Sequence, residues 1–204
     1  RSELHMNLKT LLLGHHDDHS IPRIGSALDR MEAGSRLYTT RSATREDMVT
    51  LWELMKGQEL EADHFVPSGT DPLEEVIHHG KNSLPAFTHF QKRFCRSGDD
   101  TGDVYGFNRG STEWLVGPGY FVSHGTSDEK DPPSSYVIDY TRIPPKKVEA
   151  WPEIRGNEGG IGALVYGRMK DYMRKVSNHV SIGKAYKDGK EVGAYFMLCR
   201  QDPQ

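Results

Sequence analysis

Two residues of this chain have the type and setting for acid–base chemistry, Asp139 and His179. Asp139 lies between Ile138 and Tyr140 in an alternating segment, and a carboxylate on the inner face of an apolar sheet is costly unless it is paired. Such a residue is a candidate for ligand binding or proton transfer; the alternative is that Asp139 points outward to water. His179, near Asp171 in the sequence, suits acid–base work by its pKa, or it simply ends a helix. We predict both as catalytic candidates.

Aromatic residues recur along the same half of the chain. Tyrosine hydroxyls on an otherwise apolar lining suit a small, mostly apolar ligand, whereas the alternative for each ring is ordinary core packing. Arg142 or Arg155 is a possible partner for Asp139. The predicted ligand-binding residues are Trp114, Tyr120, Tyr136, Tyr140, Arg155, Tyr166 and Tyr195.

Histidine clusters raise the question of a metal site. The run His15-His16-Asp17-Asp18-His19 has suitable ligand types. It lies in a weakly patterned arm, however, so we favour a solvated loop and predict no metal. The adjacent His78 and His79 are expected at the surface, at a helix end. The sequence holds no nucleophile elbow, Walker loop or Cys-x-x-Cys motif, which argues against the common hydrolase, NTPase and redox classes. We predict no cofactor.

The composition of the chain limits the classes of partner that it can be expected to bind. The 204 residues carry a net charge of -3, with basic and acidic residues interspersed, so nucleic acid is not an expected partner. No run approaches the roughly 20 apolar residues of a membrane helix, and no export signal is recognised. Cys95 and Cys199 suit a reducing compartment, although a single disulfide stays open. We therefore expect a cytoplasmic protein with a small-molecule ligand and no membrane partner.

The elements that must position these residues differ between the two halves. Residues 1–36 are predicted as an N-terminal arm, of which 1–5 resemble a cloning remnant, and residues 37–204 as one domain. Within it, 37–97 are predicted to be mainly helical. Thr44 and Asp47 resemble a capping box that opens a helix ended by Gly57. Further helices are predicted from Asp71 and after Pro85, the latter with three phenylalanines at helical spacing.

Residues 101–200 are predicted to be mainly β. Strands are expected at 104–107, at 113–123 with a break at Gly117-Pro118-Gly119, at 136–143 and at 163–167. A short amphipathic helix is expected at 169–176. Asp188-Gly189 predicts a type I′ hairpin between the last two strands. The fold class is therefore α+β: an antiparallel curled sheet or lipocalin-like β-barrel, around one helix, with a helical N-terminal layer.

Two stretches resemble a family of poorly characterised proteins, the Gly-x-Trp-x-Gly type, in which that signature precedes a small lipocalin-like barrel. The first stretch runs from Glu46-Asp47-Met48 to Phe90-Gln91-Lys92-Arg93-Phe94, and the second covers residues 163–200. Together they span about half of the chain. Where the signature would fall, the chain has Gly57-Gln58-Glu59-Leu60-Glu61. The resemblance implies a lipocalin-like barrel and no particular reaction.

These observations lead to three alternative hypotheses of function. The leading hypothesis is a barrel that binds a small hydrophobic or aromatic ligand. The second is a cofactor-free cyclase, isomerase or lyase on a small natural-product-like substrate, with Asp139, His179 and tyrosine hydroxyls as acid–base groups. The third is a GCN5-related acetyltransferase, in which Arg155 to Gly162 and the following helix would hold the pyrophosphate of acetyl-CoA. A titratable pair inside the cavity favours the enzyme over the binder.

Overall fold

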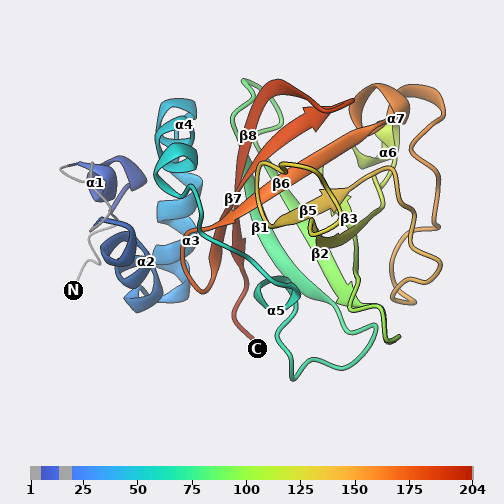
Figure 1. Cartoon of the computed structure of the whole chain (residues 1–204), viewed down its shortest axis with the longest axis horizontal. Helices are drawn as coiled ribbons and strands as arrows, with labels where there is room; N and C mark the ends of the chain where they lie inside the picture. The colour runs from blue at the N-terminus through green and yellow to red at the C-terminus, as the bar shows by residue number, and fades with distance from the viewer. Residues whose placement is uncertain (1–5, 14–19, 204) are drawn as a thin grey trace.

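The computed structural model describes residues 6–13 and 20–203 of the chain. In this part, eight antiparallel strands follow one another around a closed barrel, and the last strand pairs with the first (Figure 1). Closure leaves the sheet without a free edge. The strands are β1 (Val76–Asn82), β2 (His89–Arg96), β3 (Val104–Arg109), β4 (Phe121–Gly125), β5 (Tyr136–Asp139), β6 (Met169–Lys175), β7 (Val180–Lys187) and β8 (Lys190–Arg200).

Helices of the first part of the chain cover the barrel on one side (Figure 1). The inner two, α3 (Ala33–Arg41) and α4 (Arg45–Leu54), lie against β7 and β8, and α1 (Leu8–Leu12) and α2 (Ser20–Arg30) lie farther out. Leu28 and Trp52 from these helices share one buried cluster with Ile182 and Met197 of the strands. Each fully buried side chain of this size contributes about 1.5–3 kcal/mol, so the cluster fixes the helices to the barrel wall.

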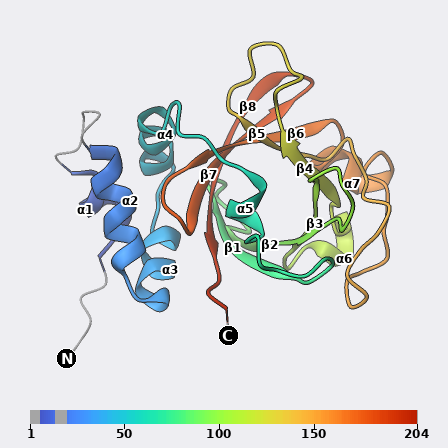
Figure 2. The ribbon, with the colours of Figure 1, turned by 60° about the horizontal axis from the view of Figure 1, so that its bottom comes forward.

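One end of the barrel is filled by α5 (Ala62–Phe65), which Figure 2 shows against the ring of strands. Phe65 is fully buried, and its ring lies 5.0 Å from those of both Phe94 and Tyr136. Two short helices, α6 (Glu113–Val116) and α7 (Gly160–Val165), lie side by side near the other end. The interior is therefore packed at the α5 end, and the free space is at the end of α6 and α7.

Several sequence predictions are confirmed. Of the two predicted forms, a curled antiparallel sheet and a barrel, the strands adopt the closed barrel. Thr44 caps α4 in a capping box with Asp47. Asp188 and Gly189 link β7 to β8 with φ values of 51° and 74°, and a type I′ turn requires a positive φ at both positions. Gly117 also has a positive φ, of 83°, and ends α6 four residues before β4 begins at Phe121.

The predicted helices at 71–77 and after Pro85 are wrong, because β1 and β2 occupy residues 76–82 and 89–96. A spacing of four residues satisfies both periods: it returns to the same face of a helix and to the same face of a strand. Phe90 and Phe94 therefore share the inner face of β2. The helical part of 37–97 extends only to residue 65.

Three predictions in the second half are wrong as well. Residues 169–175 form strand β6, so the barrel does not enclose a helix there; Met169 and Met173 face inward and Tyr172 faces the outer helices. Residues 160–165 form α7 and not a strand. Residues 113–116 form α6, and the strand after it begins only at Phe121.

The long connection between β5 and α7 covers the outside of the barrel. Trp151 packs there on Phe107 and Tyr120, with ring centroids 4.9 and 6.4 Å away. Residues 155–162 thus follow an irregular connection and not a strand. The strand–loop–helix arrangement that a pyrophosphate loop requires is not formed there, which removes the basis for the acetyltransferase hypothesis.

Candidate functional site

A cavity of about 460 Å³ opens at the α6 and α7 end of the barrel. This volume is within the range of small-molecule sites, which are concave and mostly apolar with a few convergent polar groups. Its walls include Phe90, Tyr166, Met169 and Phe196. The polar groups gather at its floor, where Lys92 is the central residue.

Residues two apart in a strand point to the same face, so Lys92 points into the barrel together with Phe90 and Phe94 of β2. Its ammonium nitrogen Nζ donates a hydrogen bond to Oδ1 of Asn108, 2.8 Å away, and another to the hydroxyl of Tyr140. Oδ2 of Asp171, on β6, lies 3.5 Å from the same nitrogen. Only 4% of the Lys92 side chain and 7% of that of Asp171 are exposed. The amine is thus held from three sides.

Burial acts on the two charges in opposite directions. Desolvation lowers the pKa of Lys92, although the attraction of Asp171 partly raises it. Desolvation likewise raises the pKa of Asp171, against the effect of Lys92 and of a hydrogen bond with Tyr140. Both shifts favour the neutral amine and the neutral acid. The pair contributes no net charge to the floor of the cavity, whether the proton is on Nζ of Lys92 or on the carboxyl group of Asp171.

Aromatic rings surround the amine. Nζ of Lys92 lies 4.9 Å from the ring centroid of Phe196, 5.1 Å from that of Tyr140, and 5.4 Å from those of Phe90 and Phe121. Ring faces at this distance attract a cation. They stabilise a positive charge at Nζ and exclude water from it.

Three of these rings are positioned by glycines. Each phenylalanine stands directly opposite a glycine of the neighbouring strand and lies over it. A Cβ added at Gly183 would be 2.2 Å from the ring of Phe196, and one at Gly106 would be 2.4 Å from that of Phe121. The cross-strand pairs are Gly80–Phe90, Gly106–Phe121 and Gly183–Phe196. The missing side chains let the rings lie against the barrel wall, which leaves the cavity open.

Exposed apolar side chains form a collar around the cavity mouth. Leu115 and Val165 line the cavity and are 47% and 44% exposed, and Phe87 of the β1–β2 loop also lines it at 67%. Their neighbours on α6 and α7, Trp114 and Leu164, are 83% and 77% exposed. An apolar ligand entering here would remain in contact with apolar surface.

Three of the predicted ligand-binding residues are at the cavity. Tyr140 contributes to its floor, and the ring of Tyr166 stacks on that of Tyr140 at 5.3 Å. Tyr195 is at the cavity edge, but its ring belongs to the outer cluster beneath the helices, with Arg45 stacked over it.

The other four are elsewhere. Trp114 is on the collar and does not line the cavity, and Arg155 is exposed in the long connection. Tyr120 is buried outside the barrel, where its hydroxyl donates to the carbonyl of Pro152 at 2.5 Å. Tyr136 is inside but packs on Phe65 at the filled end. Tyr120 and Tyr136 are thus core packing residues, and Trp114 and Arg155 are surface residues.

Asp139 faces outward, as Ile138 and Tyr140 face inward, yet it is only 3% exposed. Its carboxylate accepts hydrogen bonds from the backbone N–H and the hydroxyl of Thr141 at 2.9 and 2.6 Å. Nε2 of His124 lies 3.5 Å away and Nζ of Lys170 3.7 Å away. Asp139 is thus a paired carboxylate on the outside of the barrel, and the prediction that it faces the cavity is wrong.

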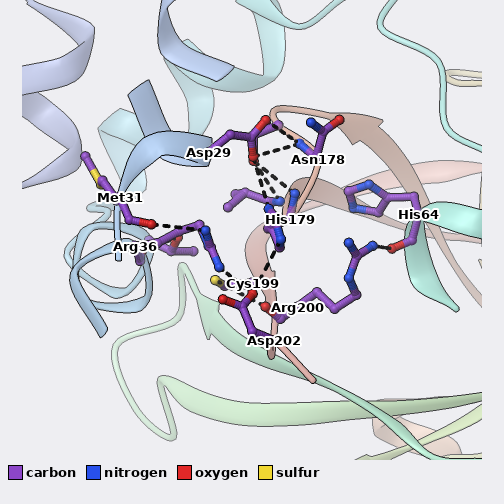
Figure 3. Close-up of polar contacts among 12 residues, drawn as sticks. Asp29, Met31, Arg36, His64, Asn178, His179, Cys199, Arg200 and Asp202 are labelled. Atoms are coloured by element: carbon purple, nitrogen blue, oxygen red, sulfur yellow. Dashed lines mark hydrogen bonds and ion pairs between the residues drawn. The ribbon is translucent and has the colours of Figure 1, made fainter. Parts of the chain in front are cut away.

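His179 is also outside the barrel, in the turn after β6. Figure 3 shows its ring between Asp29 of α2 and Asp202 near the C-terminus. Nδ1 lies 3.1 Å from Asp29 and Nε2 3.4 Å from Asp202, which in turn binds Arg36 at 2.5 Å. This network fixes α2, α3 and the C-terminal segment to one another. Asp139 pairs with Lys170 at the opposite end of β6, so the two predicted catalytic residues do not meet.

The prediction that His78 and His79 lie at a helix end is wrong, because both are in strand β1. His78 is fully buried inside the barrel, where Nε2 lies 2.9 Å from the carbonyl of Phe65. Burial lowers its pKa to about 3. His79 alternates to the outer face and pairs with Gln201 at 2.9 Å. The 15–19 cluster lies outside the described residues, and within those described no group of three His, Cys, Asp or Glu side chains is arranged to hold a metal ion.

Sequence reasoning missed Lys92 and Asp171. The available signal was a charged residue in the apolar phase of a strand: Lys92 between Phe90 and Phe94, and Asp171 between Met169 and Met173. Both segments were predicted as helices, so the positions of Lys92 and Asp171 on the inner faces of strands were not recognised. Cys95 and Cys199, the two cysteines, are buried and free, and the pKa of Cys95 is raised by burial to about 12.

No family model, curated protein or solved structure matches the chain. The resemblance to the Gly-x-Trp-x-Gly type stays a prediction. Among the described helices, none has both the length and the apolar character needed to cross a bilayer.

Proposed function

We propose that the protein binds a small hydrophobic or aromatic molecule in the cavity at the open end of its barrel. The observation that carries this proposal is the combination of an apolar, aromatic wall with a buried polar floor. A cavity of about 460 Å³ lined by Phe90, Tyr166 and Phe196 provides the apolar surface, and Asn108, Tyr140 and Lys92 provide orientation. The apolar collar supports the same proposal, because large apolar side chains exposed together mark sites of interaction.

A neutral aryl probe, N-phenyl-1-naphthylamine, tests this function by its fluorescence on transfer from water into the cavity. The structure provides a matched pair of variants on β8. Ala194 lines the cavity, whereas Val192 lies two residues earlier and does not. We expect A194W to abolish probe binding and V192W to retain it. Equal binding by both variants would place the probe elsewhere and contradict the proposal.

The second candidate function is a cofactor-free enzyme on the same scaffold, an isomerase, cyclase or lyase. It is favoured by one observation: a titratable pair, Lys92 and Asp171, meets at the cavity floor. Proton transfer to or from a bound carbon acid would be detected by NMR as deuterium uptake at the α-carbon of an aryl ketone in D₂O. We expect uptake with the wild-type protein and none above background with D171N; a background rate with both excludes this function for that substrate class.

A further inference from the structure

The amine of Lys92 is placed for covalent chemistry and not only for binding. It lies at the floor of a cavity open to the outside, and its hydrogen-bond partners Asn108 and Tyr140 fix its position. In β2 the neighbouring basic residue Arg93 points out of the barrel and pairs with Glu75 at 3.0 Å. Arg109 also borders the cavity, but its guanidinium lies over the ring of Phe107, 5.5 Å from the centroid, outside the barrel. Lys92 is therefore the basic group at the floor of the cavity.

The charge balance of the floor disfavours a simple ionic role for this lysine. A carboxylate ligand would have to compete with Asp171, which already lies 3.5 Å from Nζ. A neutral ligand faces no such competition. Burial lowers the pKa of Lys92, so its uncharged form is easier to reach than that of an exposed lysine, and an uncharged amine is a nucleophile toward carbonyl carbon.

We infer that Lys92 captures an apolar ligand bearing an aldehyde, forming a protonated imine at the cavity floor; this inference rests on the proposed binding function. The Nζ lone pair forms a bond to the carbonyl carbon as the π bond of the carbonyl breaks, and a proton passes from the nitrogen to the oxygen to give a carbinolamine. The C–O bond then breaks and the oxygen leaves as water, its last proton supplied by Asp171. In sum, amine, carboxylic acid and aldehyde yield an iminium cation, a carboxylate and one water.

The surroundings stabilise this product. The new positive charge is at the nitrogen that Asp171 faces, so the iminium and the carboxylate form an ion pair. Four ring faces lie 4.9 to 5.4 Å from the same nitrogen. Asn108 and Tyr140 accept hydrogen bonds from Lys92 before the reaction, and ordered acceptors of this kind hold the amine for attack.

Lys170 provides a control within the same molecule. It also lies between carboxylates, Glu129 at 2.7 Å and Asp139 at 3.7 Å, but it is outside the barrel and 33% of its side chain is exposed. Desolvation lowers the pKa of Lys170, but the hydrogen bond that its Nζ donates to Glu129 and the nearby carboxylates raise it above its ordinary value. An aldehyde that reacted with lysines merely by exposure would modify Lys170 and leave Lys92 untouched.

The test is reductive trapping of the wild-type protein with trans-cinnamaldehyde and cyanoborohydride, followed by peptide mass spectrometry. The hydride converts the iminium to a stable secondary amine. We expect Lys92 to carry the cinnamyl group at a rate at least about tenfold above that of Lys170, because the neutral fraction of a buried amine is larger. D171N, which lacks the acid, should trap more slowly, but the wild-type result stands without it should that variant not fold.

Cinnamyl alcohol separates this inference from the proposed function, because it has the shape of the aldehyde and cannot form an imine. If Lys92 stays unmodified while the alcohol displaces the naphthylamine probe, the imine is excluded and ligand binding stands. If Lys92 stays unmodified and the alcohol does not displace a bound probe, the cavity excludes the cinnamyl group and the inference fails, whereas the proposed function fails only if the probe itself does not bind. Labelling of Lys170 in preference to Lys92 also overturns the inference.

Discussion

Lys92 and Asp171 come within 3.5 Å of each other although their strands, β2 and β6, are not neighbours in the barrel. The contact therefore crosses the interior. It joins opposite walls at the depth where the cavity ends and the packed core of Phe94 and Phe121 begins. A polar pair at this depth both limits the cavity and links two parts of the sheet that share no backbone hydrogen bonds.

Removing one member of this pair should destabilise the fold more than removing both. K92M leaves Asp171 without its partner, and D171L leaves Lys92 likewise, so we expect each to lower the free energy of unfolding by about 3 kcal/mol. K92M/D171L replaces the pair by apolar side chains and should recover most of that loss. Urea unfolding of the four proteins measures the coupling. Additive single effects would mean that the two groups do not interact.

Gly183 keeps the ring of Phe196 against the wall, and G183A should force that ring into the cavity. A Cβ there would lie 2.2 Å from the ring. We expect a loss of about 1–3 kcal/mol of stability from overpacking, together with weaker binding of the aryl probe. The control is G34A, because nothing lies within 4 Å of a Cβ at Gly34 in α3. An unchanged probe affinity in G183A would refute the steric role of this glycine.

Acid should unfold the protein through its buried histidines. Burial lowers the pKa of His78 to about 3 and that of His64 well below the usual 6.5. The unfolded chain therefore binds protons that the folded barrel does not, and stability falls as the pH drops below about 6.5, by up to about 1.4 kcal/mol per pH unit for each group. H78Q removes one titrating group. Its urea midpoint should depend less steeply on pH than the wild-type midpoint; identical slopes would contradict this.

His124 should act in the opposite direction. A hydrogen bond with Asp139 raises its pKa above 6.5, against the effect of burial. Protonated His124 thus stabilises the fold fully below pH 6.5, and this stabilisation is lost as the pH rises through the raised folded value. NMR titration of the His124 ring should give a raised pKa that returns toward 6.5 in D139N. A pKa insensitive to that substitution would show that Asp139 is not the cause.

Local signals predicted the parts of the fold that depend on local chemistry. The capping box of Thr44 and Asp47 and the hairpin at Asp188 and Gly189 are each determined by residues within a few positions of one another. Helix and strand were confused where the period was ambiguous. Phe90 and Phe94, four residues apart, fit either structure, and their environment on the inside of a barrel depends on strands far away in the sequence.

The candidate site depends on the same distant pairing. Tyr140 and Tyr166 were predicted as ligand-binding residues, and the structure places both at the cavity. Asp139 was placed on the wrong face, because alternation states that neighbours point in opposite directions but not which of them points inward. The partnership of Lys92 with Asp171 required barrel closure, which brings residues 79 positions apart into contact.

The glycines opposite Phe90 and Phe196 have a consequence for selectivity. They make no contact that recognises a ligand, yet these two rings leave space above the amine because the glycines have no side chain. A single added methyl group at Gly80 or Gly183 would meet only the ring opposite it, so it would change which molecules fit while Lys92 and Asp171 are retained. The range of acceptable ligands can thus shift by mutation of the wall alone, while the chemistry of the floor is inherited unchanged.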